Sequence, residues 1–313
     1  MSARSSTLTA QHSSFPVYAV LGLSLLGISF AAPLVRLSAA HPVSIAAWRL
    51  AFSLLLVSVP LIATRGWRQW RLLGAREIAL ACGAGVLLAL HFWSWNTSVG
   101  MTSVATAVVL VNLQPVILGV FSAAWLKEAP SNRQWAGIGL AMIGALVVVS
   151  PDFGGHMGLD NRALIGDLLA FVGAVTAAFY YLSGRRLRQT IDLWPYVALV
   201  YGACLVTLLL IAGVLRVPLT PQPPREIAIF VALAIGPMML GHTGMNWALK
   251  YLPAYVVNLT TLGEPIGATV LAAVLPGIRE VPPTITVVGG LIVLSGIAVA
   301  LPRGRGGSGE TGT

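Results

Sequence analysis

Long apolar stretches separated by short polar connections dominate the sequence. None of them alternates apolar and polar residues over about ten positions, as the strands of a membrane barrel do. Each apolar stretch of about 20 residues therefore predicts a membrane-spanning helix. Ten such helices are expected, over residues 17–37, 43–63, 78–97, 102–126, 134–150, 163–183, 194–215, 226–248, 254–275 and 282–301. The connections are short, so the function is expected to lie within the membrane or at its two faces.

The composition indicates the same class of protein. Hydrophobic residues make up 57% of the 313 residues and charged residues only 9%, against about 25% charged residues in an average soluble domain. So few charges cannot cover the surface of a water-soluble fold of this size. Two cysteines exclude a disulfide scaffold, and the net charge of +9 comes from short basic clusters between apolar stretches. An all-α, polytopic membrane protein remains, with membrane lipid and not nucleic acid as a partner.

The distribution of Lys and Arg predicts the orientation in the membrane. With the N-terminus in the cytoplasm, thirteen basic residues lie in cytoplasmic segments and five on the other side, while Arg49 lies within a span. Cytoplasmic connections of membrane proteins are enriched in Lys and Arg. The tails 1–16 and 302–313 are therefore both expected in the cytoplasm, with the protein in a plasma membrane (the inner membrane of a bacterium).

The two halves of the chain share a spacing of polar residues and prolines. Asn96 and Pro115 in the first half each lie 150 positions before Asn246 and Pro265 in the second. The alternative is chance similarity between two apolar segments of like composition. If the repeat is real, the units 17–150 and 163–301 hold five helices each, an odd number, and must enter the membrane from opposite sides. Inverted repeats of this kind, enclosing a central cavity, are typical of secondary transporters.

Three short motifs are similar to those of a known family. They are Ala248-Leu249-Lys250-Tyr251-Leu252 leading to Glu264-Pro265, Arg49 within Ala46-Ala47-Trp48-Arg49-Leu50, and Leu126-Lys127-Glu128. With them the chain resembles the EamA-type members of the drug/metabolite transporter superfamily over nearly its whole length, and among these the exporters of aromatic amino acids. The resemblance implies a basket of ten helices around a central cavity. The chain departs from the pattern at Gln114, which stands where the second half has Glu264.

Charged groups and prolines inside the predicted spans are the first candidates for mechanism, because polar groups deep in a bilayer are costly. Glu264 is the carboxylate nearest the middle of a span and is the candidate for proton coupling, with structural pairing or capping beside Pro265 as the alternative. Arg49 could counter a substrate carboxylate. The family shares this arginine but no common substrate, so the resemblance favours a gating or structural role for Arg49, and the same role is expected of Pro115 and Pro265.

Polar and aromatic residues within the spans are the candidates for substrate binding. His91 and Trp95 are four residues apart and share one helical face, which suits an aromatic or amphipathic ligand. For every candidate the alternative is a hydrogen bond between helices or a place in the aromatic belt at the membrane surface. The candidates are His91, Trp95, Asn96, Asn112, Gln114, Tyr180, Tyr181, His242, Asn246, Asn258 and Thr261.

The motifs that the sequence lacks narrow the function further. There is no H-E-x-x-H or G-x-S-x-G sequence, which argues against an enzyme, and no G-x-x-x-x-G-K loop, which leaves a gradient as the energy source. No metal site and no cofactor are expected. The predicted function is secondary active or facilitative export of small amphipathic metabolites by a monomer, with aromatic or hydrophobic amino acids as the first candidates. The alternatives are a multidrug or cationic-compound exporter of the same superfamily, a phosphate-ester transporter and an intramembrane enzyme.

Overall fold

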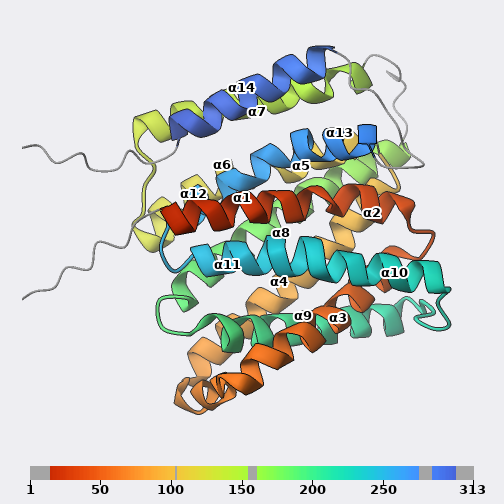
Figure 1. Cartoon of the computed structure of the whole chain (residues 1–313), viewed down its shortest axis with the longest axis vertical. Helices are drawn as coiled ribbons and strands as arrows, with labels where there is room; N and C mark the ends of the chain where they lie inside the picture. Colours follow the sequence, from red (N-terminus) through yellow and green to blue (C-terminus); the bar gives the residue numbers. More distant parts are fainter. Residues whose placement is uncertain (1–14, 103, 154–160, 275–283, 301–313) are drawn as a thin grey trace, which may run out of the picture.

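The computed structural model describes residues 15–102, 104–153, 161–274 and 284–300, and within these ranges the chain is helical without any strand (Figure 1). An all-α fold is thus confirmed for the described residues. The α-helices are α1 (Phe15–Ser29), α2 (Ala31–Leu37), α3 (Pro42–Ala63), α4 (Ala75–Val99), α5 (Val104–Val111), α6 (Gln114–Phe121), α7 (Asn132–Phe153), α8 (Asn161–Leu187), α9 (Leu193–Val214), α10 (Pro224–Leu233), α11 (Gly244–Ala248), α12 (Ala254–Asn258), α13 (Glu264–Val274) and α14 (Thr284–Ala300). Four π- or 3₁₀-helical segments accompany them: η1 (Gly66–Leu72), η2 (Ser122–Leu126), η3 (Ala234–Thr243) and η4 (Leu259–Gly263).

Among the described residues, six helical stretches are long and apolar enough to cross a membrane, as expected of an integral membrane protein. They are Pro16–Leu37, Pro42–Ala63, Ala75–Val99, Leu164–Leu187, Leu193–Val214 and Pro224–Ala248. Each coincides with a span expected from the sequence. The other expected spans, at 102–126, 134–150, 254–275 and 282–301, coincide with α5 to η2, α7, α12 to α13, and α14.

Two helical stretches are interrupted beside a proline. The helix α5 ends at Val111, and α6 begins at Gln114 with Pro115 in its first turn. The helix α12 passes through η4 into α13, which begins at Glu264 and continues with Pro265. Proline is tolerated in a first helical turn, because its missing N–H would have no partner there in any case. Each interruption therefore starts a new helical segment with a polar residue directly before the proline.

The helix between α10 and α11 is wound differently. Over η3 its backbone takes the wider π-helical turn, with Pro237 inside the segment. Proline removes one backbone donor and displaces the carbonyl of the preceding turn, and π-helical segments of this kind are frequent at functional sites. His242 lies in the last turn of η3 and is brought onto the inner side of the bundle.

The helices pack as a bundle with one pair set apart (Figure 1). The helix α4 packs against α8 and α9, and α1 packs against η3, α11 and α13, while α3 contacts α9. The helices α7 and α14 pack mainly against each other, and Figure 1 shows them together at the top of the view, beyond α5, α6 and α13. The core of the bundle therefore lies among α1 to α6 and α8 to α13.

Glycine allows the close approach of α7 and α14. A Cβ atom added to Gly137 would lie 2.5 Å from the backbone nitrogen of Ala300, and one added to Gly296 would lie 2.4 Å from that of Ala141. No real side chain fits at such distances. Small residues that let two backbones come this close are a usual device of helix pairs in membranes.

Arginine side chains hold helix ends together at both ends of the bundle. At the end formed by α11 and α12, on the left of Figure 1, Arg185 pairs with Glu128 at 2.6 Å and donates from Nη1 to the carbonyl of Leu249 at 2.7 Å. At the end formed by α2 and α10, on the right of Figure 1, Arg36 donates from Nη1 to the carbonyl of Val99 at 2.9 Å. Both arginines bond a carbonyl that a helix end leaves free.

Candidate functional site

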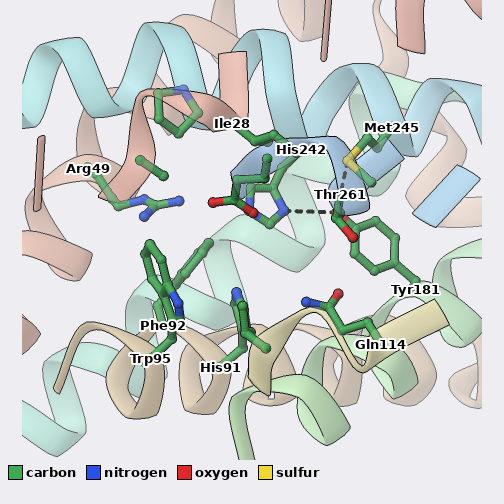
Figure 2. A pocket seen from close by; sticks show the side chains of 14 residues that line it. Ile28, Arg49, His91, Phe92, Trp95, Gln114, Tyr181, His242, Met245 and Thr261 are labelled. Carbon is green, nitrogen blue, oxygen red and sulfur yellow. Dashed lines mark hydrogen bonds between the residues drawn. The ribbon is translucent and has the colours of Figure 1, made fainter. Parts of the chain in front are cut away.

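A cavity of about 40 Å³ lies in the middle of the bundle, where side chains from both halves of the chain converge (Figure 2). About 10 to 15 Å³ in this measure holds one water molecule, so the cavity has room for a few waters only. Its lining residues are Ile28, Ala31, Arg49, His91, Phe92, Trp95, Val111, Gln114, Tyr181, Pro237, His242, Met245, Thr261 and Glu264.

The structure brings part of the sequence-derived candidate set to this cavity. The candidates in its wall are His91, Trp95, Gln114, Tyr181, His242, Thr261, Glu264 and Arg49. The candidates outside its wall are Asn96, Asn112, Tyr180, Asn246, Asn258, Pro115 and Pro265. Both groups include residues of α4, α6, α8 and α13, where the difference is one of helical face, while Asn246 and Asn258 lie on α11 and α12 and Asn112 lies between α5 and α6.

The asparagines outside the wall donate to neighbouring groups. Asn96 donates to the carbonyl of Pro42 at 3.2 Å, and Asn112 donates to the carbonyl of Val108 in its own helical stretch at 2.9 Å. Asn246 donates to the carbonyl of His242 at 2.8 Å and to the hydroxyl of Tyr180. The bonds of Asn96 to Pro42 and of Asn246 to Tyr180 join different helices, as is expected of buried polar groups in a membrane protein, while the other two stay within one helical stretch.

Two histidines and two aromatic residues form one side of the cavity. The rings of His91 and Trp95 are nearly parallel, 6.4 Å apart between centroids with an interplanar angle of 9°. The ring of His242 is parallel to that of Tyr181, and Tyr181 Oη lies 3.3 Å from His242 Nδ1. The two histidine rings are 6.2 Å apart. The two stacked pairs meet at the histidines, whose rings are inclined to each other by 64°, and together they make a polarizable surface with the Tyr181 hydroxyl at one end.

The tautomer of His91 follows from its neighbour. His91 Nδ1 lies 2.9 Å from the carbonyl of Gly173 in α8. A carbonyl only accepts, so Nδ1 must donate its hydrogen, and a neutral imidazole then presents Nε2 as an acceptor. The ring is thus fixed in position by α8 while its other nitrogen stays available for a ligand.

Arg49 is the fixed positive charge of the cavity. It extends from α3, and its side chain is 1% exposed. Its guanidinium carbon lies 3.8 Å from the centre of the Phe92 ring, a cation–π contact, and its Nη2 donates to the sulfur of Met238 at 3.0 Å. Its Nε and Nη1 atoms have no hydrogen-bond partner within the part of the chain that the structure describes.

Glu264 is the negative counterpart in the same cavity. It is the first residue of α13, where a helix N-terminus favours a negative charge. Its carboxylate is close enough to Arg49 for the two charges to interact, but among the described side chains none forms an ion pair with either residue. The cavity therefore holds one cation and one carboxylate that are near each other and not bonded.

The two interrupted helices meet beside the cavity. Asn258, at the end of α12, donates from Nδ2 to Gln114 Oε1 at the start of α6, at 3.2 Å. Thr261 in η4 also reaches the cavity and donates to the carbonyl of Asn258 at 2.8 Å. The bond between Asn258 and Gln114 joins the point where the first half is interrupted to the corresponding point in the second half.

The apolar residues of the wall were not among the residues singled out from the sequence. Phe92 lies next to His91, and Met245 follows His242 by three positions, so both share a face or an edge with a histidine that was singled out. Val111 likewise precedes Gln114 by three positions, whereas Ile28, Ala31 and Pro237 have no such neighbour. In a membrane helix the same apolar residue types face lipid, neighbouring protein or a cavity, so residue type does not identify the cavity wall. A helical spacing from a candidate polar residue is the only pattern that could have identified these residues.

The site has the composition of a binding pocket for a small organic molecule. Within the described ranges, no group of three or more His, Cys, Asp or Glu residues could hold a metal ion. What the cavity does offer is aromatic surface, a neutral amide, hydroxyl groups, one cation and one carboxylate, the mixture by which small-molecule sites fix orientation and specificity.

Comparison with known proteins gives a consistent result. The family model of the EamA-like transporter family matches residues 14–150 and 164–301. The uncharacterized transporter YyaM of Bacillus subtilis is 23% identical over 288 residues, covering 90% of this chain and 92% of that protein. The uncharacterized transporter YdfC of the same organism is 21% identical over 248 residues, covering 79% and 78%. One crystal structure shares the fold with a TM-score of 0.72 at 20% identity, over 92% of this chain and 98% of its own.

Proposed function

The chain belongs to the EamA-like transporter family, and we propose on this premise that it exports small amphipathic metabolites by alternating access. Aromatic and hydrophobic amino acids are the first candidates for its substrate. Transport in general follows from the family. The substrate class and the direction are the proposal, and the narrower resemblance to exporters of aromatic amino acids is part of it.

The observation that carries the proposal is the cavity itself. Its wall takes residues from both segments that match the family, and the aromatic side chains of Phe92, Trp95 and Tyr181 are set beside polar groups able to hold an ammonium or a carboxylate. An amphipathic molecule needs both kinds of surface. A cavity that holds only a few waters is too small for an amino acid, so loading requires the helices to separate on one side, as alternating access demands.

We further propose ten spans arranged as two inverted five-helix repeats, over residues 17–150 and 163–301. The helix neighbours support this arrangement. The halves are compared by equating their helices in order, so that α1 corresponds to α8, α3 to α9, and α4 to the stretch from α10 to α11. The contact of α4 with α8 then corresponds to the contacts of η3 and α11 with α1. The contact of α4 with α9 corresponds to that of η3 with α3. Two further contacts, α3 with α9 and α7 with α14, each join a helix to its own equivalent in the other half. A twofold relation between the halves produces this pattern.

The arginine contacts at the two ends of the bundle support the same relation. Arg36 and Arg185 each donate to the last turn of another helix, at the carbonyls of Val99 and Leu249. These two carbonyls are 150 positions apart in the sequence, and the two arginines 149. In an inverted repeat such equivalent contacts lie on opposite faces of the membrane, where each can help to close one entrance.

The remaining expectations complete the proposal. Both tails lie in the cytoplasm, as the distribution of Lys and Arg favours, and the functional unit is a monomer. Glu264 couples transport to protons, because it is a carboxylate facing the cavity without a bonded partner among the described residues. Pro115 and Pro265 start the helical segments that meet beside the cavity, which supports a role in gating.

Reconstitution tests this function directly. Purified protein in liposomes is expected to release or take up labelled phenylalanine or tryptophan down a concentration gradient, faster than empty liposomes do. The alternative of a cationic-compound exporter predicts movement of a labelled aromatic cation in the same vesicles and none of the amino acids. That second result would overturn the amino acid proposal while leaving the family assignment intact.

A further inference from the structure

The unused hydrogen-bond donors of Arg49 are unusual for a buried arginine. A guanidinium has five N–H donors in a planar fork and no acceptor. Of the polar atoms of Arg49, Nη2 has a partner, and this partner is the sulfur of Met238, a weak acceptor. Nε and Nη1 are buried and have no partner in the described part of the chain. An arginine kept only for structure normally has oxygen acceptors for its donors.

The contact with Phe92 explains how the charge is tolerated and why the donors stay free. The guanidinium carbon lies over the ring, 3.8 Å from its centre, so the aromatic face stabilises the charge from one side. The N–H bonds lie in the guanidinium plane and are not used by this contact. Figure 2 shows the guanidinium extending from α3 toward the middle of the cavity. Arg49 therefore presents donors to whatever occupies that space.

A second donor in the wall has the same property. The indole nitrogen of Trp95 is buried without a hydrogen-bond partner, although Trp95 lines the cavity. Its N–H can only donate. Arg49 and Trp95 can thus both donate hydrogen bonds to a ligand, and neither can accept one. A group that complements them is an acceptor with a negative charge.

We propose that Arg49, assisted by the indole N–H of Trp95, binds a carboxylate group of the transported molecule, so that the cavity selects small molecules that carry a carboxylate. This inference rests on the proposed transport function and narrows its substrate class. It also assigns Arg49 a binding role, where the sequence had favoured gating or structure. Arg–carboxylate bonds are among the strong charge-assisted hydrogen bonds, and the planar fork suits two parallel bonds to the two oxygens.

The surroundings of Arg49 are consistent with an exchangeable anion. Glu264 interacts with it electrostatically but is not hydrogen-bonded to it, so Arg49 is free to accept another carboxylate. The other titratable groups of the cavity wall are His91, His242, Tyr181 and Glu264, and Cys204 and Tyr201 of α9 also lie close enough to interact with Arg49. His91 already uses one nitrogen on Gly173. Apolar side chains, including Ile28 and Met245, remain for the rest of the ligand.

Ligand pairs that differ only in the carboxylate test this inference on the unmodified protein. The probes are phenylalanine and phenylalaninamide, leucine and leucinamide, and 3-phenylpropionate and 3-phenylpropionamide, each measured by the rise in unfolding temperature of the detergent-solubilised protein. Acids are expected to bind on the order of tenfold more tightly than their amides, because charge-assisted bonds are lost in the amide. Equal binding of acid and amide, tighter binding of amides, or no binding of any acid overturns it.

The same set of probes separates this inference from the proposed function. If 3-phenylpropionate binds and its amide does not, while neither amino acid binds, the carboxylate site stands and the proposal of amino acid export fails. If phenylalanine and phenylalaninamide bind alike and both are transported by liposomes, aromatic transport stands and the carboxylate site fails.

Variants test whether the preference for acids over amides comes from Arg49. Arg49→Gln is expected to remove the preference for acids, and Glu264→Gln to keep it or increase it, because Glu264 competes for the same cation. Arg186→Gln is the matched control, since Arg186 is exposed and lies outside the cavity wall. If Arg49→Gln does not fold, Trp95→Phe takes its place, with an expected loss of roughly threefold in acid binding and unchanged amide binding. Unchanged acid preference in the folded variant overturns the assignment.

Discussion

Polar side chains in the middle of this bundle differ in whether their atoms have partners. The amide nitrogens of Asn96, Asn112 and Asn246 donate to groups on neighbouring turns or helices. Arg49 and Trp95, in contrast, reach the cavity with donors that have no partner within the described ranges. An unpaired buried donor costs free energy, on the order of 1–3 kcal/mol. The three asparagines also carry buried amide oxygens without a partner in the described part of the chain, so Arg49 and Trp95 differ from them in that their unpaired atoms belong to side chains that line the cavity.

Replacing Tyr181 tests the aromatic side of the cavity. Tyr181→Phe keeps the ring stacked on His242 and removes the hydroxyl that contacts His242 Nδ1. Without this bond the His242 ring is held less firmly in the cavity wall, and binding of phenylalanine is expected to weaken roughly fivefold, with little effect on the rate at saturation. Uptake rates in liposomes over a range of substrate concentrations measure this.

Tyr180→Phe is the matched control for that experiment. Tyr180 is the adjacent residue, lies outside the cavity wall and accepts a hydrogen bond from Asn246. Its loss is expected to lower the unfolding temperature and to leave the apparent affinity for phenylalanine unchanged. If Tyr180→Phe weakened binding as much as Tyr181→Phe, the placement of the site beside His242 would be wrong.

Replacing Glu264 tests proton coupling. Glu264→Gln removes the one carboxylate among the described residues that line the cavity and puts a neutral amide of the same shape in its place. Uptake by the wild type is expected to change when a pH gradient is imposed across the liposome membrane, and uptake by the variant is expected not to change. The comparison is made against uptake at equal pH on both sides. The same response in both proteins would remove Glu264 from the coupling mechanism.

Interrupted helices bring part of the cavity wall into place. The helices that the sequence predicted most directly are the uninterrupted ones, such as α3 and α9, because a long apolar stretch is a sufficient pattern. The sequence also indicated Gln114 and Glu264 through the prolines that follow them, and both reach the cavity. It could not predict that Asn112 would turn away, because the orientation after a break depends on backbone geometry that apolar spacing does not encode.

Helix α4 shows what spacing can predict. His91 and Trp95 are four positions apart, and the structure places both rings in the wall, nearly parallel. Asn96 is the next residue on the same helix and lies outside the wall, because one position rotates a side chain by about 100°. The position of the Arg49 guanidinium also depends on α4, because it lies over the ring of Phe92. A contact between two helices cannot be derived from the spacing within either helix alone.

The pairing of α7 with α14 gives a prediction about stability. Gly137→Ala is expected to lower the unfolding temperature in detergent, because the added Cβ would lie 2.5 Å from the backbone of Ala300. Overpacking of this kind typically costs about 1–3 kcal/mol. Gly139→Ala is the control on the same helix, since nothing lies within 4 Å of the position of its added Cβ. Equal unfolding temperatures of the two variants would contradict the close packing of the two helices.

As a whole, the molecule is a helical membrane transporter with a cavity at the meeting point of its two halves. The six long apolar helices and the family match over both segments establish the class. The corresponding contacts of Arg36 and Arg185 at the two ends of the bundle support one entrance on each side. A site shared between the halves must then be open to each face of the membrane in turn.

The accessibility of one cavity residue from each side of the membrane tests this central claim most directly. Thr261→Cys, in a chain whose own cysteines Cys82 and Cys204 are replaced by alanine, places a thiol in the cavity wall. Its reaction with a membrane-impermeant maleimide is measured in right-side-out and in inverted vesicles. We predict labelling in both preparations, each slowed by a transported substrate. Labelling from one side only, under conditions in which the same protein transports, would contradict alternating access to a shared cavity.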